Sequence, residues 1–191
     1  LEPYFKKRSH FAPFKKTIST YSQKGCFWYK RRSCVFCEEF TTYRTKRPTD
    51  YWAEIENIVK TYNVDIIFDV SDSPLSNKKW LRQLSNSKPS NLKCSLFLYG
   101  RIDEINDEVI NILRHINCYE ILAGIESGDN EILKTANKGF TVKDILDGAR
   151  LLAGVDIKLY PSFVLGLPGE TMDSLLRTEE LVEKLVSFGN V

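Results

Sequence analysis

The chain has 191 residues, 42% of them hydrophobic, which is enough to bury the core of one domain. Its formal net charge is only +2, so the overall charge indicates neither a nucleic-acid nor an anionic-membrane partner. No apolar run approaches the roughly 18 residues of a membrane span, and no signal-peptide pattern opens the chain. Five cysteines without a secretion signal favour a reducing, cytoplasmic compartment.

Residues 1–16 read as a lead-in segment and residues 17–191 as one domain, in which β-prone runs alternate with helical patterns. We predict strands at Thr17–Ser22, Asp65–Val70, Cys94–Tyr99, Glu120–Ile125 and Lys158–Leu165. Helical patterns cover Tyr51–Tyr62, Val109–Ile116, Val142–Leu152 and Thr171–Ser187. Asp50 is the expected N-cap of the first helix, and Thr141 with Asp144 resembles a capping box for the third.

This alternation predicts an α/β fold with a parallel sheet and helices outside it. Periodicity alone leaves a doubly wound sheet and a barrel open. In both, functional residues follow the strands at their carboxyl ends. Short basic runs at Lys6–Arg8 and Lys30–Arg32 are typical of solvated surface; the alternative is attraction of an anionic substrate or an electron-donor protein.

Three cysteines crowd into the segment after the first predicted strand. Cys34 and Cys37 form a Cys-x-x-Cys, Cys26 precedes them by eight positions, and Gly25 allows a sharp turn before the first. Three thiolates without an obvious fourth ligand suit a four-iron cluster with one iron left open. A structural zinc site is the alternative, with Cys94, Cys118 or a histidine as fourth ligand, although both cysteines are expected in the core. A thioredoxin-like motif leaves Cys26 unexplained.

At these residues the sequence resembles the radical S-adenosylmethionine (radical SAM) superfamily, whose usual motif is Cys-x3-Cys-x2-Cys. The first gap here is longer, giving an atypical Cys-x7-Cys-x2-Cys, while the aromatic residue before the last cysteine is present as Phe36. The resemblance implies that Cys26, Cys34 and Cys37 hold a [4Fe–4S] cluster and that Phe36 lies close to the adenine of S-adenosylmethionine.

Two later segments carry the resemblance further. After the second strand, Ser71 and Asp72 occupy the place of the family's amino-group-binding motif, in an Asp-containing variant seen in cobalamin-associated relatives. After the fourth strand, Gly-Ile-Glu-Ser-Gly resembles a segment of the same relatives, which implies that Glu126 and Ser127 contact the cofactor. Read without the resemblance, Ser71 and Asp72 form an ordinary turn, whereas Glu126 needs a buried partner.

The remaining segments follow in family order. Lys138, in Asn-Lys-Gly-Phe-Thr, is implied to contact the carboxylate of S-adenosylmethionine, and its alternative is a surface lysine before a turn. Leu165 and Leu167, in Phe-Val-Leu-Gly-Leu-Pro-Gly-Glu-Thr, are implied to pack on the adenine. Tyr21, Trp28 and Tyr99 are candidates to line a substrate pocket, although packing is the commoner role of aromatic side chains.

The resemblance implies a partial (β/α)6 TIM-like barrel whose last βα unit is missing from this chain. It implies a radical SAM enzyme that cleaves S-adenosylmethionine reductively and abstracts hydrogen from an unknown substrate, with methyl transfer as an expected outcome. The cofactors are a [4Fe–4S] cluster, S-adenosylmethionine and, through a domain outside this chain, cobalamin. The partner is an electron donor such as a flavodoxin or ferredoxin. The alternatives are a structural or electron-transfer metal domain, and a nucleoside-binding module without catalysis.

Overall fold

The computed structural model describes residues 15–28, 34–37 and 43–191, and the two basic runs predicted as surface lie outside them, as does most of the lead-in segment. Within the described residues, five parallel strands form one sheet in the order β1-β4-β5-β6-β7. Their bounds are Thr17–Thr20 for β1, Ile66–Asp69 for β4, Ser95–Gly100 for β5, Cys118–Glu126 for β6 and Lys158–Phe163 for β7.

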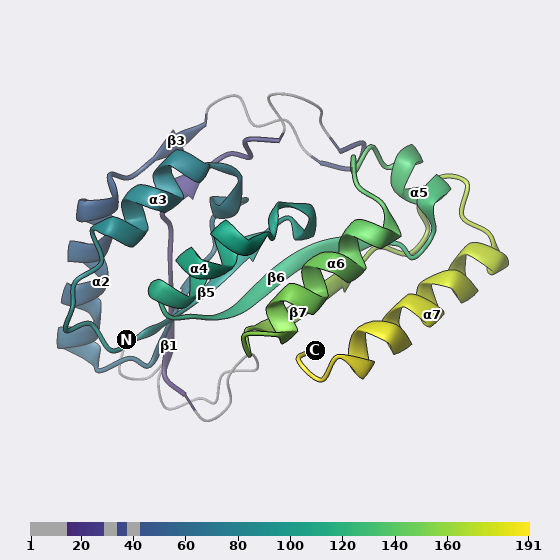
Figure 1. Cartoon of the computed structure of the whole chain (residues 1–191). Coiled ribbons are helices and arrows are strands. Elements are labelled where there is room, and N and C mark those ends of the chain that lie inside the picture. Colours follow the sequence, from purple (N-terminus) through teal and green to yellow (C-terminus); the bar gives the residue numbers. More distant parts are fainter. Residues whose placement is uncertain (1–14, 29–33, 38–42) are drawn as a thin grey trace.

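The helices cover one face of this sheet and follow the strand order across it (Figure 1). They are α2 Pro48–Tyr62, α3 Lys78–Asn86, α4 Asp107–His115, α6 Val142–Ala153 and α7 Met172–Ser187. Short α5 (Asn130–Thr135) and the 3-10 turns η1 (Pro74–Ser76) and η2 (Ile102–Glu104) follow β6, β4 and β5. A two-stranded antiparallel ribbon, β2 (Gln23–Lys24) with β3 (Arg44–Thr45), brackets the cysteine segment. No helix among the described residues is long and apolar enough to cross a membrane.

The two faces of the sheet have different neighbours because successive side chains of a strand point in opposite directions. Residues such as Ile67, Leu98 and Ile121 join the helices in the main hydrophobic core. The opposite face carries a separate cluster that contains no helix residue. There the rings of Phe68 and Phe97 stack with centroids 4.2 Å apart. One layer of helices on a parallel sheet is the arrangement of a barrel wall.

The sheet is open, since β1 and β7 lie at its two edges. This agrees with a partial barrel. The Leu159 N–H donates to the Asn190 carbonyl (2.9 Å), and the Asn190 amide donates to the Ile157 carbonyl (2.9 Å). Residue 190 therefore lies along the free edge of β7, where a sixth strand would pair. That further βα unit stays a prediction.

Most predicted elements are confirmed to within two residues at each end. The capping box of Thr141 and Asp144 is present, and Thr171 caps α7. The prediction that Asp50 caps the first helix was wrong, because α2 begins two residues earlier, at Pro48. Proline is suited to the first position of a helix. Asp50 lies inside the helix and pairs with Arg47. Helices α3 and α5 and the ribbon were not predicted, since they are too short for a clear periodic pattern.

Candidate functional site

The carboxyl ends of the strands gather the predicted site residues at one edge of the sheet. The described cysteines, at positions 26, 34 and 37, come between β2 and β3 in the chain, η1 and η2 follow β4 and β5, and Glu126 ends β6 (Figure 1). The site is therefore built from turns that are far apart in the chain, as expected for parallel α/β folds.

The three cysteines differ in exposure: Cys34 is buried, Cys26 is half-buried and Cys37 is exposed. A hydrogen bond from the Cys37 thiol lowers the pKa of Cys34 to about 6 against the opposing effect of burial, helped by the positive charges of Lys138 and Arg101. The same bond, burial and the nearby Cys34 and Cys26 sulfurs raise the pKa of Cys37. The three thiols thus influence one another electrostatically.

The described side chains can also be compared with the ligand set of a single metal ion, such as structural zinc. In the described part of the chain, no three His, Cys, Asp or Glu side chains converge as ligands of one metal ion. The other two cysteines lie in the core, as expected. Burial raises the pKa of Cys94 to about 11 and raises that of Cys118 further. Neither Cys94 nor Cys118 is therefore placed as the fourth ligand of a zinc site.

Side chains after β4 fix the backbone that leads into the cysteine segment. The Ser71 hydroxyl is fully buried and accepts hydrogen bonds from the backbone N–H groups of Ser22 and Gln23, both at 2.9 Å. It donates to the Asp69 carboxylate, which also accepts the Ser22 N–H at 3.1 Å. Since buried N–H groups need partners, this network holds residues 22 and 23 in one conformation.

Asp72 continues the same arrangement toward the first cysteine. Its carboxylate accepts a hydrogen bond from the backbone N–H of Gly25 (2.8 Å), the residue just before Cys26. Gly25 has φ 88°, a conformation that favours glycine. Ser71 and Asp72, predicted to bind the cofactor, are therefore both hydrogen-bonded to the backbone that leads up to Cys26.

Arg101 links Trp28, near the first cysteine, to the turn after α5, and the sequence did not reveal this contact. Its guanidinium lies 3.9 Å from the ring centroid of Trp28 and donates to the Lys138 carbonyl (2.6 Å) and to Asp103 (3.1 Å). On Gly139 (φ 75°), an added Cβ would lie 2.5 Å from the Trp28 ring, so only glycine permits this approach. Trp28, a candidate for a substrate pocket, is packed between Arg101 and residue 139 and also lines a cavity with Phe27.

Glu126 and Lys138 form a buried ion pair at the end of β6. The Lys138 Nζ lies 2.9 Å from the Glu126 Oε1, and the two side chains are 8% and 6% exposed. Glu126 has φ 67°, which L side chains rarely adopt. A Cβ on Gly124 would lie 2.3 Å from that carboxylate oxygen. Lys138 also lies 5.6 Å from the ring centroid of Phe36, which brings two predicted residues together beside the cysteines.

The other predicted residues divide between the surface and the interior. Leu165 is 71% exposed and Phe36 is 42% exposed, so both are accessible to a ligand. Leu167 is buried against Ile132 and Ala136.

Ser127 faces α7 at the end of β6. Its hydroxyl lies 3.3 Å from that of Thr178, which accepts the Gly128 N–H (2.9 Å). Ser127 therefore contributes to the packing of α7 on β6.

Two aromatic substrate-pocket candidates lie elsewhere, in β5 and just after β1. Tyr99 lies on the face without helices, where its ring is 5.5 Å from that of Phe68. Tyr21 is exposed next to the β2–β3 ribbon. No contact in the described residues brings Tyr21 and Tyr99 together.

A family model described as the radical SAM superfamily matches residues 21–182. The chain is 24% identical over 195 residues to an uncharacterized methyltransferase of Pyrococcus horikoshii, covering 97% of this chain and 40% of that protein. It is 26% identical over 173 residues to the tRNA-2-methylthio-N(6)-dimethylallyladenosine synthase of a Thermoanaerobacter species, covering 78% of this chain and 36% of that protein. The chain thus spans two-fifths or less of these relatives.

Solved structures show the same fold. The radical S-adenosylmethionine methyltransferase TsrM from Kitasatospora setae matches with a TM-score of 0.76 and 19% identity, over 90% of this chain and 34% of that one. The cobalamin-dependent S-adenosylmethionine radical enzyme OxsB matches with a TM-score of 0.72 and 19% identity, over 87% of this chain and 26% of that one. These likenesses concern the architecture of the sheet and its helices.

Proposed function

Because this chain belongs to the radical SAM superfamily, whose enzymes use a [4Fe–4S] cluster and S-adenosylmethionine, we propose that Cys26, Cys34 and Cys37 hold such a cluster. When bound, the cluster and S-adenosylmethionine would supply one-electron reductive cleavage of the cofactor, with methionine as the leaving group, and hydrogen-atom abstraction from substrate. The observation that carries the proposal is the placement of three mutually interacting thiols, with two buried cations beside them, at the carboxyl edge of a parallel sheet.

The residues present fit a cluster better than a single ion. Each thiolate of a cluster binds its own iron, so the three cysteines need not converge on one point. The donor set consists of sulfur alone, which is the usual ligation of iron–sulfur clusters. Lys138 and Arg101 are buried close enough to Cys34 to favour its thiolate form, which offsets the cost of gathering negative charge in a partly dry site.

We assign recognition of S-adenosylmethionine to residues that lie beside the cysteines. Glu126 and Lys138 offer a carboxylate for the ammonium group and an ammonium for the carboxylate of the methionine part, at the cost of opening their own pair. The exposed side chains of Phe36 and Leu165 offer apolar surface for the adenine. The assignment accounts for a buried charged pair and accessible apolar side chains at one edge of the sheet.

The remaining predicted residues support the site from within the protein. Ser71 and Asp72 hold the backbone in front of Cys26, so we assign them the orientation of the first ligand. Ser127 and Leu167 pack the turns after β6 and β7 onto neighbouring helices. Any contact that these four make with S-adenosylmethionine is secondary to these roles.

We propose methyl or methylthio transfer as the reaction class. Relatives over most of this chain are named as a methyltransferase and as a methylthio-adenosine synthase, and cobalamin is named in the titles of similar structures. Cobalamin would be held by a domain outside this chain. The substrate is not specified by any described residue.

Radical SAM enzymes need a reductant, and we propose a flavodoxin or ferredoxin in that role. A cluster with cysteine ligands and free core thiols is best kept in a reducing compartment, so we place the protein in the cytoplasm.

Electron paramagnetic resonance on anaerobically reconstituted, reduced protein tests the proposal. We expect a reduced four-iron signal that changes shape when S-adenosylmethionine is added, together with formation of 5′-deoxyadenosine. The Cys34→Ala variant should lose both, whereas Cys94→Ala should keep them, since Cys94 lies in the core. A signal indifferent to S-adenosylmethionine would favour the electron-transfer domain, and nucleoside binding without 5′-deoxyadenosine would favour the non-catalytic module.

A further inference from the structure

Residues close to the first and second cysteines both contact the turn that carries Lys138. Trp28 lies within the atypically long gap, and its ring packs against residue 139, where an added Cβ would come within 2.5 Å of it. Just after the gap, the Val35 N–H donates to the Ala136 carbonyl (3.2 Å). The turn therefore supports the cysteine segment at two points, one inside the long gap and one beyond it.

A single side chain, that of Arg101, holds three successive residues of the same turn. Its Nη2 atom donates to the Lys138 carbonyl (2.6 Å), and its guanidinium lies 5.1 Å from the ring centroid of Phe140. It holds Gly139 through Trp28, because the indole ring lies 3.9 Å from the guanidinium and covers that glycine. The main chain of residues 138–140 is thus fixed by one cation.

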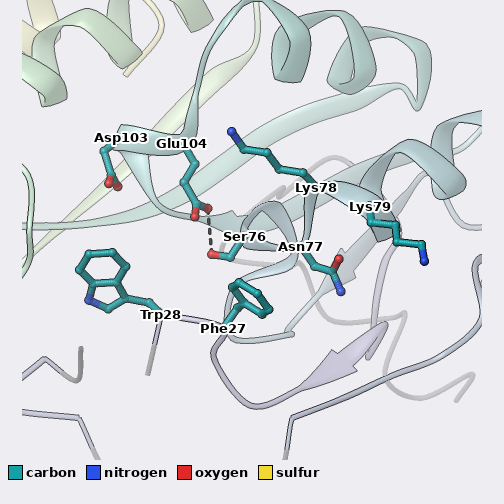
Figure 2. Close-up of a pocket in the computed structure, with 8 residues that line it drawn as sticks. All are labelled: Phe27, Trp28, Ser76, Asn77, Lys78, Lys79, Asp103 and Glu104. Atoms are coloured by element: carbon teal, nitrogen blue, oxygen red, sulfur yellow. Dashed lines mark hydrogen bonds between the residues drawn. The ribbon is translucent and has the colours of Figure 1, made fainter. Parts of the chain in front are cut away.

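The guanidinium of Arg101 is itself held in place by several groups. The residue is 8% exposed, and its Nη2 atom also donates to the Asp103 carboxylate (3.1 Å). Figure 2 shows the indole of Trp28 below Asp103, with both residues lining the same cavity. A buried cation is costly without partners, so the carboxylate and the aromatic rings stabilise Arg101 in this position. Of these partners, Trp28 is the one that the long gap supplies.

This arrangement determines where the Lys138 ammonium can lie. A lysine has a flexible four-carbon stem, so the reach of its ammonium depends on the position of its main chain. Arg101 fixes that main chain at the carbonyl of Lys138 itself. The ammonium then lies 2.9 Å from the Glu126 carboxylate and 5.4 Å from the ring centroid of Phe140. A shift of the turn would move the ammonium away from the end of β6.

We propose that Arg101 is a positioning residue for the Lys138 ammonium, and that Trp28, within the long gap, holds Arg101 in place for this role. The proposal rests on the proposed function, in which Lys138 binds the carboxylate of S-adenosylmethionine. Arg101 acts through Lys138 and does not itself bind the cofactor. The long gap thereby couples the segment of the first cysteine to recognition of that carboxylate.

Binding to the reconstituted protein with its cluster oxidised tests the proposal, since cleavage of the cofactor requires the reduced cluster. The probes are S-adenosylmethionine and decarboxylated S-adenosylmethionine, which lacks only the carboxylate. The Kd of the decarboxylated probe divided by that of S-adenosylmethionine measures recognition of the carboxylate. Arg101→Met should lower this ratio about tenfold, and Trp28→Leu, which leaves every polar partner of the turn in place, about threefold. The matched control, Arg114→Met at an exposed position of α4, should keep the wild-type ratio.

A double variant separates positioning from direct contact. Lys138→Met should lower the ratio at least as much as Arg101→Met does, and the Arg101→Met/Lys138→Met protein should show no further loss. A further loss in the double variant, or a wild-type ratio in either Arg101→Met or Trp28→Leu, overturns the proposal. A wild-type ratio in Lys138→Met instead overturns the role assigned to that lysine, and failure of the wild type to bind S-adenosylmethionine overturns the proposed function.

Discussion

The Nζ atom of Lys138 lies 2.9 Å from the Oε1 atom of Glu126, and both side chains are more than nine-tenths buried. The two residues come from different turns, since Glu126 ends β6 and Lys138 follows α5. A buried ion pair is costly to form and far more costly to break on one side. The pair therefore holds the turn after α5 against the strand end beside the cysteines.

Replacing Lys138 with methionine should leave the Glu126 carboxylate buried without its cation. We expect a loss of about 3 kcal/mol in the free energy of unfolding, measured with urea on the cluster-free protein. The Lys138→Met/Glu126→Gln double variant should recover part of that loss. Lys134→Met, on the exposed side of α5, serves as the control and should change stability by less than about 0.5 kcal/mol. An equal effect of the two lysine substitutions would contradict the pairing.

Replacing Ser71 with alanine should loosen the backbone in front of Cys26. The buried Gln23 N–H would lose this acceptor, and the Ser22 N–H would keep only the Asp69 carboxylate, which costs about 1–3 kcal/mol. We also expect reconstituted protein to hold less iron and to release it faster to a chelator. Ser90→Ala, at an exposed position, is the control. Unchanged iron content and release in Ser71→Ala would show that the network does not orient the first cysteine.

The contact between Arg101 and Trp28 should be measurable as a coupling energy. We expect the effects of Arg101→Met and Trp28→Leu on stability to differ from additivity by about 1 kcal/mol, because a cation over an indole ring contributes that much when partly desolvated. Urea unfolding of the two single variants, the double variant and the wild type gives the value. Additive effects would mean that Arg101 acts only through its hydrogen bonds to Lys138 and Asp103.

Asp129 should make stability depend on pH in the acid range. Burial raises the pKa of its carboxyl, but the N–H groups of Ile132 and Glu131 and the Arg177 guanidinium outweigh this, so the pKa lies below its usual value. The stabilisation is therefore present above the unfolded-state pKa of about 3.9 and is lost as the pH falls through the lower folded-state pKa. Asp129→Asn keeps the shape of the cap and should flatten that part of the pH profile, as followed by urea unfolding. A profile identical to the wild type would assign the acid sensitivity to other carboxylates.

The sequence alone was sufficient to predict the parallel α/β order and the placement of the candidate residues after the strands. Local physics is the reason: a buried strand such as Ile66–Asp69 needs a short run of apolar residues, and a cap such as Thr141 with Asp144 involves residues three apart. The cysteine spacing is equally local, and with the later motifs it indicated the family that the chain belongs to.

What the sequence could not reveal are contacts between residues that are far apart in the chain. Arg101 looks like any loop arginine until the fold places it on Trp28, and Ser71 looks like a turn residue until the fold brings Ser22 beside it. The positive φ of Glu126 accompanies a register shift in the pairing of β6 with β7 between Gly124 and Glu126, and no local sequence pattern predicts it. Local periodicity therefore determined the elements and their order, whereas side-chain partners were decided by the tertiary structure, because a buried polar group is satisfied only where packing brings a partner to it.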